Sequence, residues 1–211
     1  MPQQNNITIR EGLLLLWNMT ESAEELLRRY PRFNKYRPFL QSRHPRRQTE
    51  WLASRLLLDS INCRPEQVSY SPTGRPVIHH PDFNYISISH STKLAGIYLH
   101  PSIPVGLDIE SIHRNFAMVI PRFLSPEEQQ TAASLPEGPA LFWSIKEAVY
   151  KAAGKREINM GNAIHISNQS DRFKTTMQTD NEKITFEIEH CHFENQIIVC
   201  ALKSESHLFF S

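Results

Sequence analysis

The sequence predicts an α+β fold, made of two similar α+β subdomains in a pseudo-twofold arrangement, each a long helix packed on a small, mainly antiparallel sheet. Residues 46–61 and 138–155 carry apolar side chains at helical spacing, which predicts two long amphipathic helices. Short stretches that alternate apolar and polar residues surround both helices and are typical of half-buried strands. The order strand, helix, long helix, antiparallel strands therefore occurs twice.

A second observation supports an internal repeat. Each long helix contains a tryptophan followed four residues later by a charged residue, namely Trp51 with Arg55 and Trp143 with Glu147. We therefore expect two subdomains, residues 1–103 and residues 104–211.

The first half begins with a strand at 7–17 that enters a sheet. Ser22 is a plausible cap for a short helix, and Gly74 marks a turn because it supplies free backbone between two prolines. The remaining expected elements are a helix at 22–30, a long helix at 46–61 that starts near Gln48 or Thr49, a turn at 71–76, and strands at 85–91 and 95–99.

The second half begins with a strand at 105–110. Ser125 and Pro126 form a standard helix start, while Pro139 and Gly154 suit the first position and the end of the second long helix. The other expected elements are a helix at 115–123 and strands at 163–167, 173–178, 183–189 and 196–203.

Composition gives little direct information on function. The chain has 211 residues and a net charge of +1, so its overall charge favours neither nucleic acid nor an anionic membrane as a partner. Residues 28–55 are nevertheless strongly basic, with Glu50 as their single acid. Such a segment is usually a solvated face, but it can also hold a phosphorylated ligand.

The cysteines and the apolar runs point to the cytoplasm. The three cysteines show no paired spacing, which suits reduced thiols. The longest early apolar run, residues 13–17, is far too short for a membrane span and lacks the flanks of a signal peptide. His190 and His192 flank Cys191, but no second ligand cluster follows, so this segment does not indicate zinc.

Three acids could form an oxygen-only metal site. Asp108 and Glu110 are two apart on a strand, so their carboxylates emerge from one face, and Glu147 on a helix could complete the set. Such a site suits Mg²⁺, which prefers oxygen ligands and keeps part of its water shell. Separately, each acid is more simply an exposed charge, and Glu147 with Lys151 four residues later could be a surface ion pair.

At this point the sequence resembles the 4′-phosphopantetheinyl transferases. Val105–Glu110 (VGLDIE) and Phe142–Lys155 (FWSIKEAVYKAAGK) are similar to the family's GxDxE strand and WxxKEAxxK helix. Arg122–Glu127 resembles the RFFS-x-x-E segment between them, Ser71–Pro76 the G-K-P turn, and Ile88–Ser91 the ISHS strand end. The resemblance is to the larger, surfactin-synthetase-activating type.

This resemblance implies a Mg²⁺-dependent transferase that moves phosphopantetheine from coenzyme A to a serine of an apo acyl or peptidyl carrier protein. Adenosine 3′,5′-bisphosphate would be released. By resemblance, Asp108, Glu110 and Glu147 hold the metal and Glu147 also serves as base. Lys151 contacts the pyrophosphate as a clamp or acid. Lys146 shares the signature but faces elsewhere, and Trp143 is expected to pack in the core.

The resemblance also implies coenzyme contacts in the first half. His90 and Ser89 match the family's phosphate-binding strand end, and Arg47 lies near a position that contacts the 3′-phosphate. Arg75 stands where the family has lysine, so its contact can be bidentate or displaced. Weaker candidates in the basic segment are Arg32 and Lys35, and Glu127 matches a family acid to which no role is assigned.

The sequence therefore predicts a cytoplasmic, monomeric enzyme with coenzyme A as co-substrate and no nucleic-acid or membrane partner. Two other classes remain open. A non-catalytic homologue would bind coenzyme A or a carrier without transfer, although all three acids and Lys151 are present. A small Mg²⁺ phosphodiesterase would need no carrier and would not explain the GRP turn or the ISHS strand end.

Overall fold

The computed structural model describes residues 4–154, 158–169, 172–179 and 182–204. The first half of the chain contributes two hairpin strands, a group of helices and two further pairs of strands. In chain order these are β1 (Gln4–Ile9), β2 (Gly12–Asn18), α1 (Ala23–Arg29), a 3₁₀ helix (Pro31–Tyr36), α2 (Arg37–Gln41), α3 (Pro45–Asp59), a 3₁₀ turn (Pro65–Gln67), β3 (Val68–Tyr70), β4 (Pro76–Ile78), β5 (Tyr85–His90) and β6 (Leu94–His100).

The second half places one strand before its helices and four strands after them. These elements are β7 (Val105–Ser111), α4 (Ile120–Phe123), α5 (Pro126–Ser134), α6 (Gly138–Ala153), α7 (Met160–Ala163), β8 (Ile164–Gln169), β9 (Arg172–Thr179), β10 (Glu182–Phe193) and β11 (Gln196–Lys203). The predicted α+β class is confirmed.

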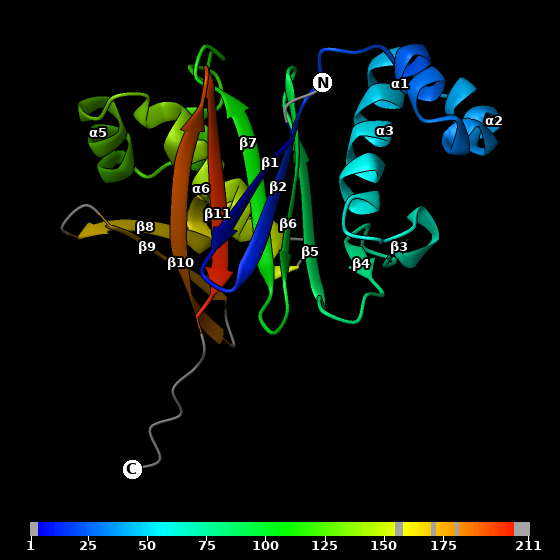
Figure 1. Ribbon diagram of the computed structural model, residues 1–211. Coiled ribbons are helices and arrows are strands. Elements are labelled where there is room, and N and C mark those ends of the chain that lie inside the picture. Colours follow the sequence, from blue (N-terminus) through cyan, green and yellow to red (C-terminus); the bar gives the residue numbers. More distant parts are fainter. Residues whose placement is uncertain (1–3, 155–157, 170–171, 180–181, 205–211) are drawn as a thin grey trace.

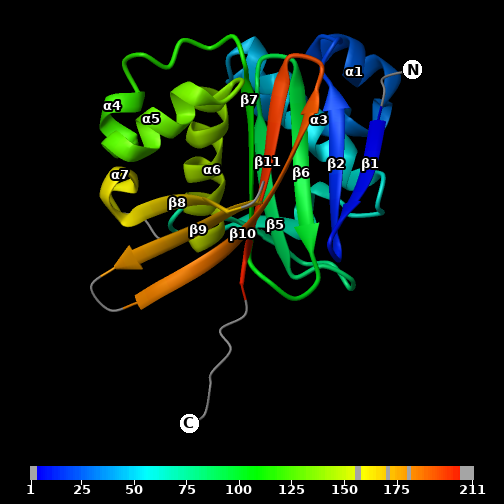
Figure 2. The same cartoon turned by 90° about the vertical axis from the view of Figure 1, so that its left-hand side faces the viewer.

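Two antiparallel sheets lie between the long helices (Figure 1). A four-stranded sheet has the order β1-β2-β6-β5 and packs against α3, while a five-stranded sheet has the order β7-β11-β10-β9-β8 and packs against α6. The distal strands β8 and β9 bend away from β7, towards α6 and α7 (Figure 2). The short pair β3-β4 stands apart as a third sheet.

Alternation along the central strands explains the layers. In β2, Leu15 and Trp17 belong to the core beneath α3, whereas Leu14 and Leu16 belong to a core between the two sheets. Leu107 of β7 contributes to that same inter-sheet core. Because successive strand residues point to opposite faces, each central strand contributes to two layers. The two halves therefore share a buried apolar interface.

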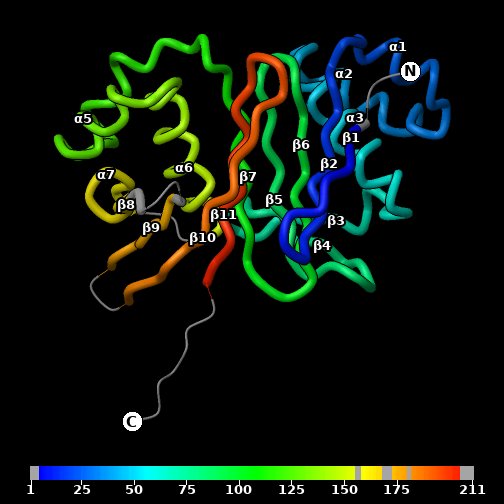
Figure 3. Tube along the Cα trace, turned by 60° about the vertical axis from the view of Figure 1, so that its left-hand side comes forward, coloured from blue at the N-terminus to red at the C-terminus, as the bar shows by residue number. Residues whose placement is uncertain are grey.

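The two sheets also share part of their strand order. In each half the first long strand pairs with the last strand, which pairs with the penultimate one: β2-β6-β5 and β7-β11-β10. The chain passes from one sheet to the other between His100 and Val105, and the two halves lie side by side (Figure 3). An exact pseudo-twofold relation, and a division into domains at residue 103, stay predictions.

Three predicted elements differ from the structure. The expected strand at 7–17 is a hairpin, which turns at Arg10, whose φ of 55° is left-handed. The helix expected at 115–123 begins only at Ile120. The first long helix starts one turn earlier than expected, at Pro45, where the His44 side chain accepts the Arg46 N–H. Local turn chemistry is the reason in the first and last cases.

A buried ion pair ties α5 and α6 together. Lys146 is fully buried, and its Nζ lies 2.7 Å from Oε2 of Glu128. Glu128 also accepts the N–H groups of Ser125, which caps α5, and of Ile166 in β8. One carboxylate thus joins two helices and a strand. Lys146 faces away from Glu147 and Lys151, as its helical position predicts.

None of the helices in the described part of the chain is long and apolar enough to cross a membrane.

We expect Glu128→Ala to destabilise the protein by about 3–5 kcal/mol, because it leaves the Lys146 ammonium buried without a counter-charge. Urea unfolding measures the change in free energy. The neighbouring and exposed Glu127 provides the matched control, and Glu127→Ala should cost less than about 1 kcal/mol. Equal costs for both variants would contradict a structural role for the pair.

Candidate active site

The strand and helix that carry the two motifs pack unusually closely. A Cβ atom added at Gly106 of β7 would lie 1.8 Å from the backbone oxygen of Ala148 in α6. Only glycine permits this approach. It brings Asp108, two residues further along β7, within reach of Lys151 on α6.

A hydrogen-bonded group forms around Asp108. Lys151 Nζ lies 2.7 Å from Asp108 Oδ1, and it also donates to the Leu107 carbonyl at 3.0 Å and to Ser89 Oγ at 3.2 Å. Ser89 in turn donates to Asp108 Oδ1 at 3.3 Å and accepts the Ile109 N–H. Ser89 is therefore buried between β5 and β7, and its hydroxyl is already fully used.

Glu147 lies one turn before Lys151 and close to both acids of β7. Burial raises its pKa, and the nearby carboxylate of Asp108 raises it further, with a smaller contribution from Glu110. The cations of Lys151 and Arg114 act in the opposite direction. A carboxyl with a raised pKa is a better proton acceptor near neutral pH than an ordinary glutamate.

Glu110 has two partners from its own segment. Its Oε1 accepts the Ser111 N–H at 2.9 Å, and its Oε2 pairs with the Arg114 guanidinium. The guanidinium also lies over the rings of Phe116 and Trp143, at 5.3 and 5.2 Å from their centroids. Trp143 is partly buried in the core of the second half, as predicted, but it also supports this arginine.

The three predicted metal ligands, Asp108, Glu110 and Glu147, lie close together but are not arranged as a complete metal site. Among the described residues, no group of three or more His, Cys, Asp or Glu side chains is arranged to hold a metal ion. However, Asp108 Oδ2 is buried and has no hydrogen-bond partner. Such an oxygen, beside two further carboxylates that repel it, fits a divalent cation with oxygen ligands. The assignment of Mg²⁺ stays a prediction.

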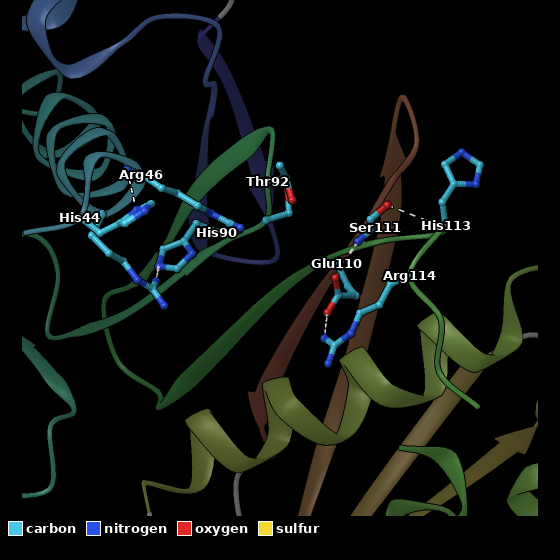
Figure 4. Close-up of a pocket in the computed structure, with 10 residues that line it drawn as sticks. His44, Arg46, His90, Thr92, Glu110, Ser111, His113 and Arg114 are labelled. Carbon is cyan, nitrogen blue, oxygen red and sulfur yellow. Dashed lines mark hydrogen bonds and ion pairs between the residues drawn. The ribbon is translucent and has the colours of Figure 1, made fainter. Parts of the chain in front are cut away.

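A pocket of about 630 Å³ opens next to these acids, between the start of α3 and the ends of β5 and β7 (Figure 4). Basic and polar side chains dominate its lining, which comprises His44, Arg46, Arg47, His90, Ser91, Thr92, Glu110, Ser111, His113 and Arg114. Arg47, His90 and Glu110 are predicted site residues. Segments far apart in sequence therefore form one cationic cavity beside the carboxylates.

Glu50 organises the α3 side of this pocket. Its side chain is only 3% exposed and accepts hydrogen bonds from Arg46 Nε at 2.9 Å and Arg47 Nη1 at 2.7 Å. His90 Nε2 lies 3.4 Å from the same carboxylate and 3.3 Å from Arg47 Nη1. Sequence analysis noted Glu50 as the single acid of the basic segment but gave it no role, because its burial depends on the tertiary packing.

Arg75 lies outside this pocket, at the C-terminal end of α6, whose last turn also carries Lys151. A Cβ added at Gly154, the left-handed cap of α6, would lie 2.4 Å from Arg75 Nη1. A cation is favoured there by the partial negative charge of the helix end. Burial lowers the pKa of Arg75. Arg75 does not line the pocket of about 630 Å³, so a coenzyme contact would have to be made beyond it.

Arg55 is a further residue that sequence analysis missed as a site residue. It is 4% exposed, donates to Tyr70 Oη at 3.0 Å, and has no acidic partner in the described part of the chain. Its guanidinium lies 5.1 Å from the Trp51 ring centroid. A buried cation without a counter-charge is costly and suits an anionic ligand. The sequence repeat, in which Trp51 and Arg55 correspond to Trp143 and Glu147, drew attention to Arg55. It did not predict that Arg55 is buried.

The weaker candidates have local partners. Arg32 pairs with Asp59 and Lys35 with Glu66, both on exposed surface. Glu127 is exposed and accepts a hydrogen bond from Ser125. The acid with several buried partners is its neighbour Glu128, and the S-x-x-E spacing of the motif in fact leads from Ser125 to Glu128.

We expect Glu50→Gln to lower the pKa of His90 further. Burial already holds that pKa below its ordinary value, and the negative charge of Glu50 partly opposes this shift, so its removal disfavours the imidazolium. An NMR titration of the His90 ring measures the effect. Glu24→Gln, on an exposed glutamate paired with Arg37, is the control and should leave His90 unchanged. An unaltered or raised His90 pKa in Glu50→Gln would contradict the assigned contact.

Comparison with known proteins gives one family match and a partial structural similarity. Residues 104–202 match the family model of the 4′-phosphopantetheinyl transferase superfamily. The holo-[acyl-carrier-protein] synthase of Thermotoga maritima is a solved structure with partial similarity: 14% identity, a TM-score of 0.40, and coverage of 49% of this chain and 64% of that one. The match thus spans less than two thirds of that synthase. No curated protein matches the sequence. Over residues 104–202, just under half of its length, the chain is therefore similar to the 4′-phosphopantetheinyl transferase superfamily.

Proposed function

We propose that this protein transfers 4′-phosphopantetheine from coenzyme A to a serine hydroxyl of an apo acyl or peptidyl carrier protein. The observation that carries the proposal is the packing of β7 against α6. It places Lys151 in contact with Asp108. It also places Glu147 beside Asp108 and Glu110, the two acids of β7. These are the four residues to which the family resemblance gives chemical roles.

The residues can divide the chemistry between them. Bound Mg²⁺ on Asp108, Glu110 and Glu147 would supply positive charge to the pyrophosphate oxygens. Glu147 would also accept the proton of the carrier serine, directly or through water, as the family resemblance implies. Lys151 is 29% exposed at its side chain, so its positive charge would stabilise the leaving phosphate as a clamp or acid.

The cationic pocket suits the phosphates of coenzyme A. Arg47 and His90 are held by Glu50 on one wall, and Glu110 lies on the other. Charged donors fixed in this way bind phosphate oxygens with little ordering cost. We assign Ser89 an indirect role in coenzyme binding, because its hydroxyl holds Lys151 and Asp108 in place. Arg75 would contact a part of the coenzyme outside the pocket.

The same proposal includes the larger, surfactin-synthetase-activating type, a monomer and a cytoplasmic location, with neither nucleic acid nor membrane as a partner. A second candidate is a non-catalytic homologue that binds coenzyme A or a carrier. The buried and unpartnered Asp108 Oδ2 favours the enzyme, because a binding module has no need for an uncompensated carboxylate oxygen.

We expect the protein, with Mg²⁺ and coenzyme A, to increase the mass of an apo carrier by one phosphopantetheine group. Asp108→Asn should reduce this transfer by roughly a thousandfold, because it removes a metal-ligand charge and the partner of Lys151. Intact-protein mass spectrometry of a carrier panel is the measurement. The control is Asp82→Asn on an exposed loop. No mass gain on any carrier, where a known transferase succeeds, would refute transfer, and a fully active Asp108→Asn would refute the assigned site.

We also expect Arg75→Ala to raise KM for coenzyme A more than it lowers kcat, because the arginine would bind phosphate equally in the ground and transition states. Steady-state kinetics at varied coenzyme A tests this. Lys174→Ala, which removes an exposed cation of β9, should change neither constant. An unchanged KM in Arg75→Ala would remove Arg75 from the coenzyme site.

A further inference from the structure

Arg114 joins two aromatic residues of the second half to a predicted metal ligand. Its guanidinium pairs with Glu110 Oε2 (Figure 4). It also lies over the rings of Trp143 and Phe116. The side chain is 41% exposed and lines the pocket. Sequence analysis gave it no role.

The pairing leaves Glu110 with a partner on each of its two oxygens. One oxygen accepts the Ser111 N–H and the other faces Arg114. A divalent cation needs a carboxylate oxygen free of an opposing cation at short distance. Asp108 differs, since its Oδ2 is unpartnered while Oδ1 faces Lys151. Asp108 therefore has one oxygen without a partner, whereas Glu110 faces the Arg114 cation that a metal would have to replace.

We propose that Arg114 is an internal counter-ion that occupies Glu110 in the metal-free protein and leaves it when a divalent cation binds. This inference rests on the proposed metal site. Arg114 and the metal compete for one carboxylate, so the arginine sets the metal affinity. Its exposure and its flexible side chain allow it to move without disturbing the core. Because it lines the pocket, the released guanidinium remains available to a phosphate-bearing ligand.

The proposal has a direct test in Mg²⁺ binding. Isothermal titration calorimetry should show that Arg114→Gln binds Mg²⁺ roughly two- to fivefold more tightly than the wild type, the size expected for loss of a partly exposed ion pair. Arg37→Gln is the matched control, since Arg37 pairs with Glu24 and is 39% exposed. Its Mg²⁺ affinity should equal that of the wild type. Thermal unfolding verifies that each variant is folded.

A second readout separates direct competition from a general effect of charge. In ¹⁵N-labelled wild type, the guanidinium resonances of Arg114, identified by their absence in Arg114→Gln, should shift as Mg²⁺ is added. If the charge of Arg114 weakened Mg²⁺ binding only from a distance, Arg114→Gln would still bind Mg²⁺ more tightly. In the wild type, however, Arg114 would then stay paired with Glu110 when Mg²⁺ binds. Binding of Mg²⁺ without this shift therefore overturns the proposal.

The remaining outcomes are also decisive. Equal or weaker Mg²⁺ binding by Arg114→Gln, with binding lost in Asp108→Asn, overturns the role of Arg114 but leaves the metal site standing. No Mg²⁺ binding by either wild type or Arg114→Gln refutes the metal site itself, together with this inference. Transfer of phosphopantetheine to a carrier, measured separately, then tests the proposed reaction independently of Mg²⁺ binding.

Discussion

The close contact between β7 and α6 at Gly106 is the constraint on which the rest of the site depends. It places Lys151 on Asp108 and brings Glu147 into the field of two further carboxylates. If an ordinary side chain separated β7 from α6, these groups would be independent surface charges that contribute little to stability. In contact, burial and mutual repulsion raise the pKa of Glu147 and leave Asp108 Oδ2 without a partner. The strain of this arrangement is what a bound cation would relieve.

The surrounding structure manages charge by pairing. Glu50 pairs with two arginines of the basic wall of the pocket, Lys151 pairs with Asp108, and Arg114 pairs with Glu110. Such pairs keep the site compact before a ligand arrives, but each cation that contacts an acid also competes with what the acid would bind. The proposed balance between Arg114 and a metal is one case. The arginines around Glu50 are the other case, because a bound phosphate would compete with the Glu50 carboxylate for them.

The two halves of the chain form one packed unit. The inter-sheet core, formed by residues such as Leu16 and Leu107, fixes β5 against β7. That contact is completed by Ser87 and Ser89 of β5, whose hydroxyls accept the N–H groups of Leu107 and Ile109. Serine side chains thus replace a backbone ladder at this seam. They leave the ends of both strands open to the pocket, where each half supplies part of the lining.

Local sequence patterns were enough to predict the α+β class, nearly all long elements and the motif residues. This was possible because periodicity, caps and short motifs are local properties. The hairpin at Arg10 was missed because an apolar run does not reveal a left-handed turn. Only the tertiary structure decided that Glu50 and Arg55 are buried, that Ser89 is used internally, and that Glu128 rather than Glu127 joins α5 to α6. Burial and pairing depend on which distant segments meet, and the cores between the layers fix those contacts.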